Sequence, residues 1–355
     1  MAARFMACDA AESTFVFLDR GPEGGAESFL LRLLARGSCC HLSGGQADAN
    51  HQIRGASMAD IYDALVIGGG PGGLTGALYL ARFRRRVRVV DDGCSRATRI
   101  PRSHNMPGYP HGVPGSKLVA AIRKQAESYG AELSVGRVER LERVAPGFAA
   151  VLADGTRLSA RTVLLATGVS DVEPDLPHLV EAVRTGALRY CPVCDGYEII
   201  DKAVGVLAAS EAGIREALYL RNFTARLHVF RVSHDFRIEE HSDRLAEAGI
   251  WWAPEPVDSL RLWDAEVRIR HGAAETSCDS VYSALGTRIH AELSMGADTD
   301  EAGYLLTDRH QKTSIDGLYA AGDVAQGLNQ ISVAAGGAAI AAAAIHLALA
   351  PGWRK

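Results

Sequence analysis

A glycine-rich turn between a predicted strand and a predicted helix constrains the fold of this chain more than any other feature. Residues 63–67 are DALVI, a short apolar run, and residues 68–73 are GGGPGG. The string that follows, LTGALYLARF, has the apolar spacing of a helix, and VRVVDD at 87–92 reads as a second strand. A strand, a tight turn, a helix and a second strand form the unit from which doubly wound nucleotide-binding domains are built.

The glycines of this turn have the spacing GxGxxG, carried by Gly68, Gly70 and Gly73. The first glycine allows the tight turn, the second lets a pyrophosphate approach the backbone, and the third lets the helix pack closely on the strand. The amides around Gly72 and Gly73 are expected to face the phosphates, because they lie at the positive end of the helix. The pattern therefore predicts a dinucleotide site at this turn.

A dinucleotide also needs a partner for its ribose, and two acids follow the turn at the expected distance. Asp91 ends the second predicted strand and Asp92 stands beside it, where a carboxylate accepts hydrogen bonds from ribose hydroxyls. Two later apolar strands end in small polar turns, LLATG at 164–168 and GLYAAGDV at 317–324. Asp323 in the second turn is positioned to reach a ribityl or phosphate group. The candidate cofactor-binding residues of these two turns are Thr167, Gly168, Gly322 and Asp323.

A similar strand–turn–helix–strand unit recurs at 203–230, and both units contain the string ALYLxxF. We therefore predict an α/β fold with two Rossmann-like three-layer domains. The first, nucleotide-binding domain comprises residues 58–175 and 288–350, and the second is inserted between its halves at 176–287. Residues 1–57 look unlike the rest, and we interpret them as a disordered extension or a misplaced start, with a small accessory helix as the alternative.

Composition narrows the class of protein. Of the 355 residues 47% are hydrophobic and 23% charged, which is ordinary for a soluble globular protein. The net charge of −4 gives no reason to expect a nucleic acid partner, and seven cysteines are too few for a secreted disulfide scaffold.

The N-terminus has no secretory pattern. The apolar stretch 331–350 is mostly alanine and glycine, so we expect a buried helix and no membrane span. A cytoplasmic location follows.

A CxxC motif lies near the middle of the chain, in YCPVCDGYE at 190–198. A zinc site commonly needs a second such pair or histidines at finger spacing; neither is present, and Cys278 stands alone, so we expect no metal. A structural disulfide across CxxC would close too short a loop to stabilise the fold much. The remaining interpretation is a redox dithiol formed by Cys191 and Cys194, with Cys94 a bystander.

Several motifs occur in a characteristic order between about residues 59 and 349. They are VIGGGPGGLTGALYLAR, SHNMPGYPHGVPG, LLATG, YCPVCDG and TSIDGLYAAGDV. In this set the chain resembles the low-molecular-weight thioredoxin reductases, flavoenzymes of the pyridine nucleotide-disulfide oxidoreductase type. The resemblance implies FAD in the first domain, with Asn105 near the flavin and Gln330 and Ile331 near its pyrimidine end. It also implies a homodimer.

The same resemblance implies roles for the CxxC region. Cys194 would lie nearer the flavin and accept its electrons, and Cys191 would be the outer thiol that attacks or resolves a partner disulfide. Asp195 follows directly, as it does in the family, and would move the proton that a thiol must lose or gain.

The resemblance fails at the second nucleotide site. In the family the inserted domain binds NADPH with another GxGxx(G/A) loop, but the corresponding residues 207–213 read LAASEAG. Side-chain β-carbons stand where a pyrophosphate needs bare backbone, and Glu211 adds negative charge. The arginine pair that holds the 2′-phosphate in the family is replaced by Val232 and Ser233.

These losses predict poor use of NADPH. Two missing charge-assisted hydrogen bonds, each contributing roughly 1.5–3 kcal/mol, would weaken binding by roughly 3–6 kcal/mol. This corresponds to on the order of a hundred- to ten-thousand-fold in affinity. Arg231 and Arg237 would restore part of it.

Three hypotheses follow for the function. The leading one is an FAD-dependent dithiol–disulfide oxidoreductase that acts on a thioredoxin-like protein or a small-molecule disulfide. Its electrons would come from ferredoxin, a flavodoxin-like protein or a reduced flavin. The second is a flavin dithiol oxidase that passes electrons to oxygen, although such oxidases often carry histidine where Asp195 stands. The third is a non-catalytic flavin-bound redox sensor, against which the intact CxxC-Asp argues.

Overall fold

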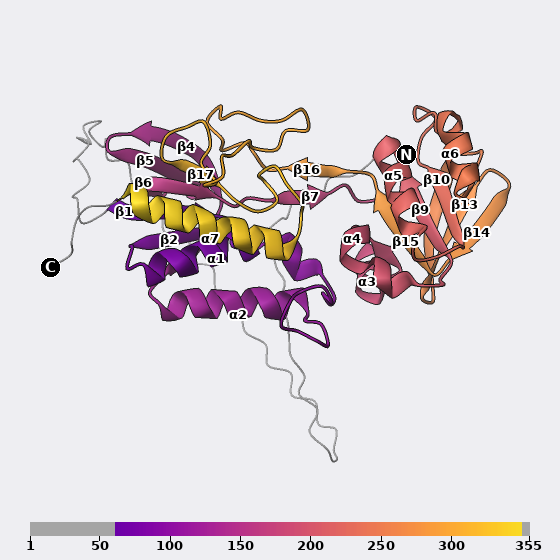
Figure 1. Ribbon diagram of the computed structural model, residues 1–355, viewed down its shortest axis with the longest axis horizontal. Helices are drawn as coiled ribbons and strands as arrows, with labels where there is room; N and C mark the ends of the chain where they lie inside the picture. Colours follow the sequence, from indigo (N-terminus) through magenta and orange to yellow (C-terminus); the bar gives the residue numbers. More distant parts are fainter. Residues whose placement is uncertain (1–60, 350–355) are drawn as a thin grey trace, which may run out of the picture. The chain divides into compact units, whose positions relative to one another are not determined.

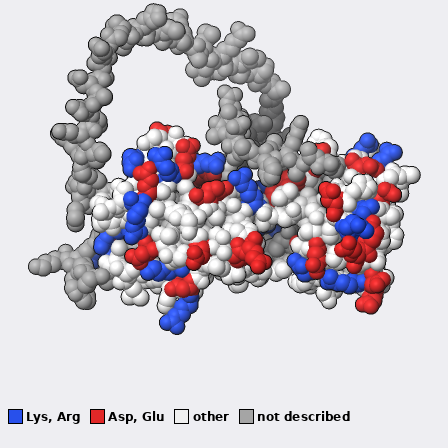
Figure 2. Space-filling model, turned by 90° about the horizontal axis from the view of Figure 1, so that it is seen from above, with Lys and Arg blue, Asp and Glu red and all other residues white. Residues whose placement is uncertain are grey.

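The computed structural model describes residues 61–349 of the chain (Figure 1). The predicted extension at 1–57 and the final residue of the predicted 288–350 segment lie outside the described residues. Figure 2 shows acidic and basic side chains interspersed over the face in view, with uncharged side chains between them. This mixture agrees with the small net charge of −4.

The first sheet has seven strands in the order β3-β2-β1-β6-β5-β4, with β17 paired to β6. Its central strands β2, β1, β6 and β17 run parallel, and β4, β5 and β6 form an antiparallel extension. The strands are β1 (Ile61–Ile67), β2 (Val87–Asp91), β3 (Glu132–Val135), β4 (Val138–Val144), β5 (Gly147–Leu152), β6 (Arg157–Leu165) and β17 (Leu318–Ala320).

The register of the parallel strands brings the predicted nucleotide motifs to one edge of this sheet. Ile67 lies opposite Val90 and Leu165, and Ala320 also lies opposite Leu165. The segments that leave these strands therefore meet there, because the carboxyl ends of parallel strands share an edge. They are the glycine turn, the Asp91–Asp92 pair, the turn after LLATG and the turn before Asp323.

Three helices cover one face of the first sheet (Figure 1). They are α1 (Pro71–Arg82), α2 (Gly115–Ser128) and α7 (Ile331–Ala348). We expected the alanine-rich helix at 331–350 to be buried, and this is correct for one face only. Ala334, Ala338 and Ile345 pack inward, whereas Leu347 is 73% exposed. By length and composition α7 could cross a membrane, which is weak evidence by itself, since core helices of soluble proteins pass the same test.

The second sheet is wholly parallel, with the order β11-β10-β9-β15-β8. Its strands are β8 (Leu188–Arg189), β9 (Val204–Ala208), β10 (Leu227–Arg231), β11 (Trp251–Trp252) and β15 (Ser280–Ala284). The helices of this part of the chain are α3 (Leu179–Thr185), α4 (Pro192–Asp195), α5 (Glu211–Leu220) and α6 (Ser242–Glu247). An antiparallel sheet of β12 (Val257–Trp263), β13 (Glu266–His271) and β14 (Ala274–Cys278) accompanies it. The predicted α/β fold with two Rossmann-like sheets is thus confirmed.

Two short strands, β7 (Val169–Asp171) and β16 (Thr287–Ile289), pair with each other in antiparallel fashion. Along the chain, β7 comes before the strands of the second sheet and β16 comes after them. The strands of the second sheet all fall between residues 188 and 284. Short 3-10 helices occupy Arg96–Arg99, Gly196–Ile199 and Ile238–His241.

The glycine turn holds α1 against β1 at a distance that side chains would prevent. Gly68 has a φ of +108°, and a β-carbon there would lie 2.3 Å from the carbonyl oxygen of Ala166. A β-carbon on Gly73 would lie 1.9 Å from the carbonyl oxygen of Gly68. Gly72 differs, because its β-carbon would meet no atom closer than 3.5 Å. The first and third glycines of the motif are therefore required by packing alone.

Gly73→Ala should lower the free energy of unfolding by about 1–3 kcal/mol, because the added methyl group overlaps backbone that cannot move away. Gly72→Ala at the neighbouring helical position is the matched control. It should be neutral or stabilising by roughly 0.5–1 kcal/mol, since glycine in a helix is less favourable than alanine. Urea unfolding followed by far-ultraviolet circular dichroism compares the two. Equal stability of the two variants would contradict the packing argument.

Candidate functional site

Open space surrounds the beginning of α1, where a phosphate group would bind. A β-carbon on Gly70 would meet only the hydroxyl of Ser95, at 3.2 Å. Gly168, with a φ of +67°, has no atom within 4 Å of its β-carbon position, and Gly322, with a φ of +79°, has none closer than 3.5 Å. The backbone amides at the start of a helix favour an anion. These residues therefore fit the pyrophosphate of the dinucleotide that the resemblance implies.

The acids at the end of β2 have partners within the protein. Asp91 is buried; its Oδ1 accepts a hydrogen bond from the Gly69 amide at 3.1 Å, and its Oδ2 pairs with Arg123 at 2.5 Å. Asp92 accepts a hydrogen bond from the amide of Cys94 at 3.0 Å. Asp91 therefore braces the glycine turn, and its contact with a ribose stays a prediction. Nothing in the sequence singled out Arg123, which reaches Asp91 from α2.

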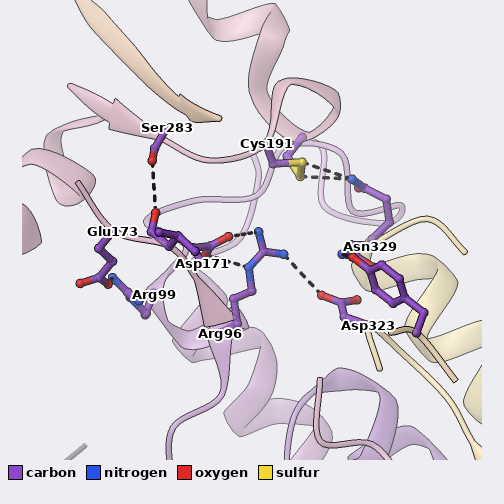
Figure 3. Close-up of polar contacts among 12 residues, drawn as sticks. Arg96, Arg99, Asp171, Glu173, Cys191, Ser283, Asp323 and Asn329 are labelled. Atoms are coloured by element: carbon purple, nitrogen blue, oxygen red, sulfur yellow. Dashed lines mark hydrogen bonds and ion pairs between the residues drawn. A yellow bond between two sulfur atoms is a disulfide. The ribbon is translucent and has the colours of Figure 1, made fainter. Parts of the chain in front are cut away.

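Asp323 lies in a network of charges that the sequence analysis did not predict (Figure 3). Arg96 donates to both carboxylate oxygens of Asp171, at 2.6 and 2.9 Å, and lies 3.4 Å from Asp323. Burial raises the pKa of Asp323, although Arg96 opposes the shift. Arg99 pairs with Glu173 beside this network. The sequence did contain a signal for this network. Two arginines, Arg96 and Arg99, follow shortly after the two acids that we predicted to bind a ribose.

The two cysteines of the CxxC motif are joined as a disulfide, and a glutamine contacts both sulfur atoms. Nε2 of Gln330 lies 3.2 Å from Sγ of Cys194 and 3.4 Å from Sγ of Cys191. Oε1 of Gln330 accepts a hydrogen bond from Asn105 at 2.9 Å. Gln330 is also the residue directly before α7, which begins at Ile331. The structure therefore brings Asn105, Gln330 and the disulfide together, as Figure 3 shows for the contact at the sulfur atoms.

A cavity of about 350 Å³ lies beside the disulfide and reaches Cys194. Its lining includes Asn105, Tyr197, Glu198 and Phe223. One carboxylate oxygen of Glu198 is buried without a hydrogen-bond partner. A buried acceptor of this kind is satisfied when a donor enters, so the cavity has the size and chemistry to receive a small polar molecule next to the sulfur atoms.

Asp195 is half-buried and has both carboxylate oxygens engaged. Arg189 donates to Oδ2 at 2.7 Å, and the hydroxyl of Tyr282 donates to Oδ1 at 2.8 Å. Burial raises the pKa of Asp195, and both partners oppose the shift. Sequence reasoning missed Arg189 and Tyr282, because β8 and β15 come together only in the folded sheet.

The second glycine loop keeps its packing role. Strand β9 ends at Ala208, and a β-carbon on Gly213 would lie 2.7 Å from the β-carbon of Ala208. Glu211 begins α5 and lies 3.3 Å from Arg244 and 3.6 Å from Arg215. The third glycine of the motif is therefore kept for close packing, while the residue that begins the helix carries a carboxylate that pairs with two arginines.

The residues after β10 are also engaged within the protein. Arg231 is buried; its Nη1 pairs with Glu239 at 2.8 Å, and its Nη2 donates to the carbonyl oxygen of Pro254 at 2.5 Å. Arg237 lies 3.9 Å from the same Glu239. Ser233 accepts a hydrogen bond from the backbone amide of Asp235. We expected Arg231 to restore part of the NADPH affinity, but its guanidinium is already held by a carboxylate and a carbonyl.

Thiol alkylation of the native, oxidised protein should distinguish the cysteines. Iodoacetamide should modify Cys94, which is exposed, and leave Cys278, which is buried and whose thiol pKa burial raises to about 12. Cys191 and Cys194 should react only after reduction, because the disulfide protects them. Mass spectrometry of the peptides reports each site. Modification of Cys191 before reduction would contradict the disulfide.

Comparison with known proteins agrees with this geometry. Residues 62–338 match the family model described as pyridine nucleotide-disulphide oxidoreductase. A thioredoxin reductase of Treponema pallidum is 28% identical over 80% of this chain and 96% of its own length. The crystal structure of HlmI superposes with a TM-score of 0.75 at 30% identity, covering 82% of this chain and 94% of that chain. The thioredoxin reductase of Streptococcus pyogenes superposes with a TM-score of 0.75 at 26% identity, covering 82% and 98%.

The family match extends across the first glycine turn, the disulfide and the whole of the second sheet, so it covers the site as well as the fold. The chain belongs to the pyridine nucleotide-disulphide oxidoreductase family, as an oxidoreductase that resembles the thioredoxin reductases.

Proposed function

We propose that this protein is an FAD-dependent dithiol–disulfide oxidoreductase that works through Cys191 and Cys194. The observation that carries the proposal is the contact of Gln330 with both sulfur atoms. The resemblance implies that Asn105 lies near the flavin and Gln330 at its pyrimidine end, and both residues lie at the disulfide. A disulfide held beside the flavin ring would be suited to exchange an electron pair with it.

FAD would be held by the open edge of the first sheet. Gly70 and Gly168 leave room for the pyrophosphate and the groups beside it, and Asp323 would accept hydrogen bonds from the ribityl chain. Gln330 and Ile331 would lie at the pyrimidine end, where the start of α7 favours negative charge. Bound there, FAD supplies the reversible uptake and release of an electron pair.

The chain's own residues would perform the thiol chemistry. Cys191 would exchange with a partner disulfide, and Asp195 would give or take the proton of a cysteine. Relatives named thioredoxin reductase support a thioredoxin-like protein as the partner, and the cavity at Cys194 supports a small-molecule disulfide as well. We also propose a cytoplasmic homodimer, to which the exposed apolar side chains of α7, among them Ile340 and Leu347, are suited.

The electron donor is proposed to be something other than NADPH, such as ferredoxin, a flavodoxin-like protein or a reduced flavin. Two features of the second sheet support this. Side chains at Ala208 and Ser210 stand where the family has the bare backbone that a pyrophosphate approaches. Arg231, which we expected to restore part of the affinity, is already held by Glu239 and by the carbonyl oxygen of Pro254.

The disulfide chemistry can be tested without knowing the donor. The purified protein should be yellow with bound FAD. It is reduced with dithionite under argon, freed of excess reductant and mixed with an aromatic disulfide reagent whose thiol product is coloured. We expect the wild-type protein to reduce the reagent and end with its internal disulfide, and Cys191→Ser and Cys194→Ser each to stop at a mixed disulfide and release less coloured thiol, because both sulfur atoms are needed to form the internal disulfide. Stopped-flow absorbance measures the reaction.

Cys94→Ser is the matched control, since it removes an exposed thiol away from the disulfide and should keep full activity. Release of as much coloured thiol by either CxxC variant as by the wild type would refute the proposed function. A wild-type protein that cannot be loaded with FAD would refute the cofactor assignment.

NADPH at millimolar concentration should bleach the flavin only slowly, because Ser210 and Glu211 obstruct its pyrophosphate and Val232 and Ser233 cannot hold its 2′-phosphate. Restoring the family residues, as Ala208→Gly, Ser210→Gly, Val232→Arg and Ser233→Arg, should strengthen NADPH binding by about a hundredfold or more. Anaerobic stopped-flow absorbance measures the rate of flavin bleaching and, from its dependence on NADPH concentration, the strength of NADPH binding.

NADH is the control ligand, since it lacks the 2′-phosphate that the two arginines would recognise. The arginine substitutions alone should therefore account for any preference of the variant for NADPH over NADH. Wild-type protein that binds NADPH at micromolar concentration and is reduced within milliseconds would show that the proposed donor is wrong.

The cavity at Cys194 also favours a second function, a flavin dithiol oxidase that passes electrons from a small dithiol to oxygen. A small dithiol added in air separates the two functions. Continuous oxygen consumption identifies the oxidase, whereas flavin bleaching without turnover identifies the reductase direction.

A further inference from the structure

The carboxylate of Asp195 is held between two strands of the second sheet. Nη1 of Arg189, on β8, lies 2.7 Å from Oδ2, and the Tyr282 hydroxyl, on β15, lies 2.8 Å from Oδ1 and 3.2 Å from the backbone carbonyl of Asp195. Each carboxylate oxygen thus has a different donor.

The register of the sheet produces this arrangement. Strands β8 and β15 are parallel neighbours, and Tyr282 lies directly opposite Arg189. Tyr282 is fully buried, and the Arg189 side chain is only 13% exposed. A buried guanidinium and a buried hydroxyl both require partners, because leaving either unpaired costs stability. Asp195 supplies an acceptor to each, directly after Cys194 in the chain.

We propose that Arg189 and Tyr282 are positioning residues for Asp195, which fix its carboxylate beside the disulfide and set the pH at which it exchanges a proton with the cysteines. The proposal rests on the proposed dithiol–disulfide function and adds to it the control of the proton.

The charges around Asp195 determine the direction of the effect. Burial raises the pKa of Asp195, Arg189 and Tyr282 lower it, and Glu198, from the short helix Gly196–Ile199, raises it. The backbone amide of Asp195 donates to the carbonyl oxygen of Cys191, and Cys194 directly precedes it in the chain. Removal of either Arg189 or Tyr282 therefore raises the pKa of the carboxyl, because each stabilises the ionised form. The Tyr282 pKa is itself raised by burial and by Asp195, so its hydroxyl stays protonated and donates.

The proton transfer balances in both directions. When the disulfide takes up an electron pair and its S–S bond breaks, two thiolates form, and protonated Asp195 would give its proton to one of them and become a carboxylate. In the other direction the ionised carboxylate would take the proton of the attacking thiol, which forms a mixed disulfide as one half of the substrate leaves as a thiolate. The second cysteine, already a thiolate, then closes the internal disulfide, and the other half of the substrate leaves as a second thiolate. In each case Arg189 and Tyr282 stabilise the ionised carboxylate.

The test uses the second direction and needs no electron donor. The purified protein, with Cys8, Cys39, Cys40 and Cys94 replaced by serine so that their thiols do not react with the reagent, is reduced with a water-soluble phosphine, freed of it, and mixed with the aromatic disulfide reagent over a range of pH. Under the proposal, exchange with the reagent requires ionised Asp195. The exchange rate plotted against pH should therefore fall on the acid side, and the midpoint of this acid limb is the apparent pKa of Asp195. Arg189→Met should move this limb to higher pH by about one unit or more. Tyr282→Phe should move it the same way by roughly 0.5–1 unit, because one hydrogen bond is lost.

Three further variants separate a positioning role from a structural one. Arg189→Lys should recover most of the wild-type profile, because the charge is kept. Asp195→Asn should abolish the limb, and Tyr282→Phe combined with Asp195→Asn should behave like Asp195→Asn alone. Arg184→Met, which removes an exposed arginine paired with Glu181 in the same sheet domain, should leave the limb unchanged.

Thermal unfolding of each variant confirms that it is folded. An acid limb that does not move in folded Arg189→Met and Tyr282→Phe would overturn the inference and leave the proposed function intact. Release of as much coloured thiol by Cys191→Ser as by the same protein with both CxxC cysteines would instead overturn the proposed function, because that variant cannot close the internal disulfide.

Discussion

The close contact between Gly73 and the carbonyl of Gly68 is the constraint on which the rest of the structure depends. Helix α1 can begin this near to β1 only because the turn carries no side chains at these two positions. Helix α1 in turn packs on α7 through small residues, with Gly76 facing Ala338. The start of α7 carries Gln330, which contacts the disulfide. The glycine turn and the redox centre are thus connected through two packed helices.

The disulfide has supports of different kinds. Gln330, which precedes a helix of the first sheet, contacts both sulfur atoms and is itself held by Asn105. In the second sheet, β8 and β15 supply Arg189 and Tyr282 to the adjacent carboxylate. Thiol exchange moves both electrons and protons, and the chain provides separate neighbours for each. Electrons would pass on the glutamine side and protons on the aspartate side.

The second sheet shows that a fold can persist when one of its binding features is replaced. Gly213 remains because helix α5 packs against Ala208 there, and a side chain would overlap it. Ser210 and Glu211 occupy positions where only a phosphate would need bare backbone, so packing does not select against them. Arg231 is buried and pairs with the exposed carboxylate of Glu239, so its guanidinium is engaged within the domain.

The sequence by itself determined the features that are local or periodic. The two strand–turn–helix–strand units, the GxGxxG turn and the CxxC pair are each contained in a short stretch, and the α/β fold followed from them. The geometry around Gly68 and Gly73 could be anticipated because close packing at that turn is a property of adjacent residues. The replacement of the second loop was visible for the same reason.

Only the tertiary structure decided which distant groups meet. Arg96 with Asp171 and Asp323, Arg123 with Asp91, and Arg189 with Tyr282 come from separate strands and helices. The exposed face of α7 was missed because alanine and glycine are small enough for either a buried or an exposed position. Ion pairs and hydrogen bonds depend on register and on helix orientation, which many distant contacts set together. A charged residue in the sequence therefore shows that a partner is needed, and only the folded chain shows which one it has.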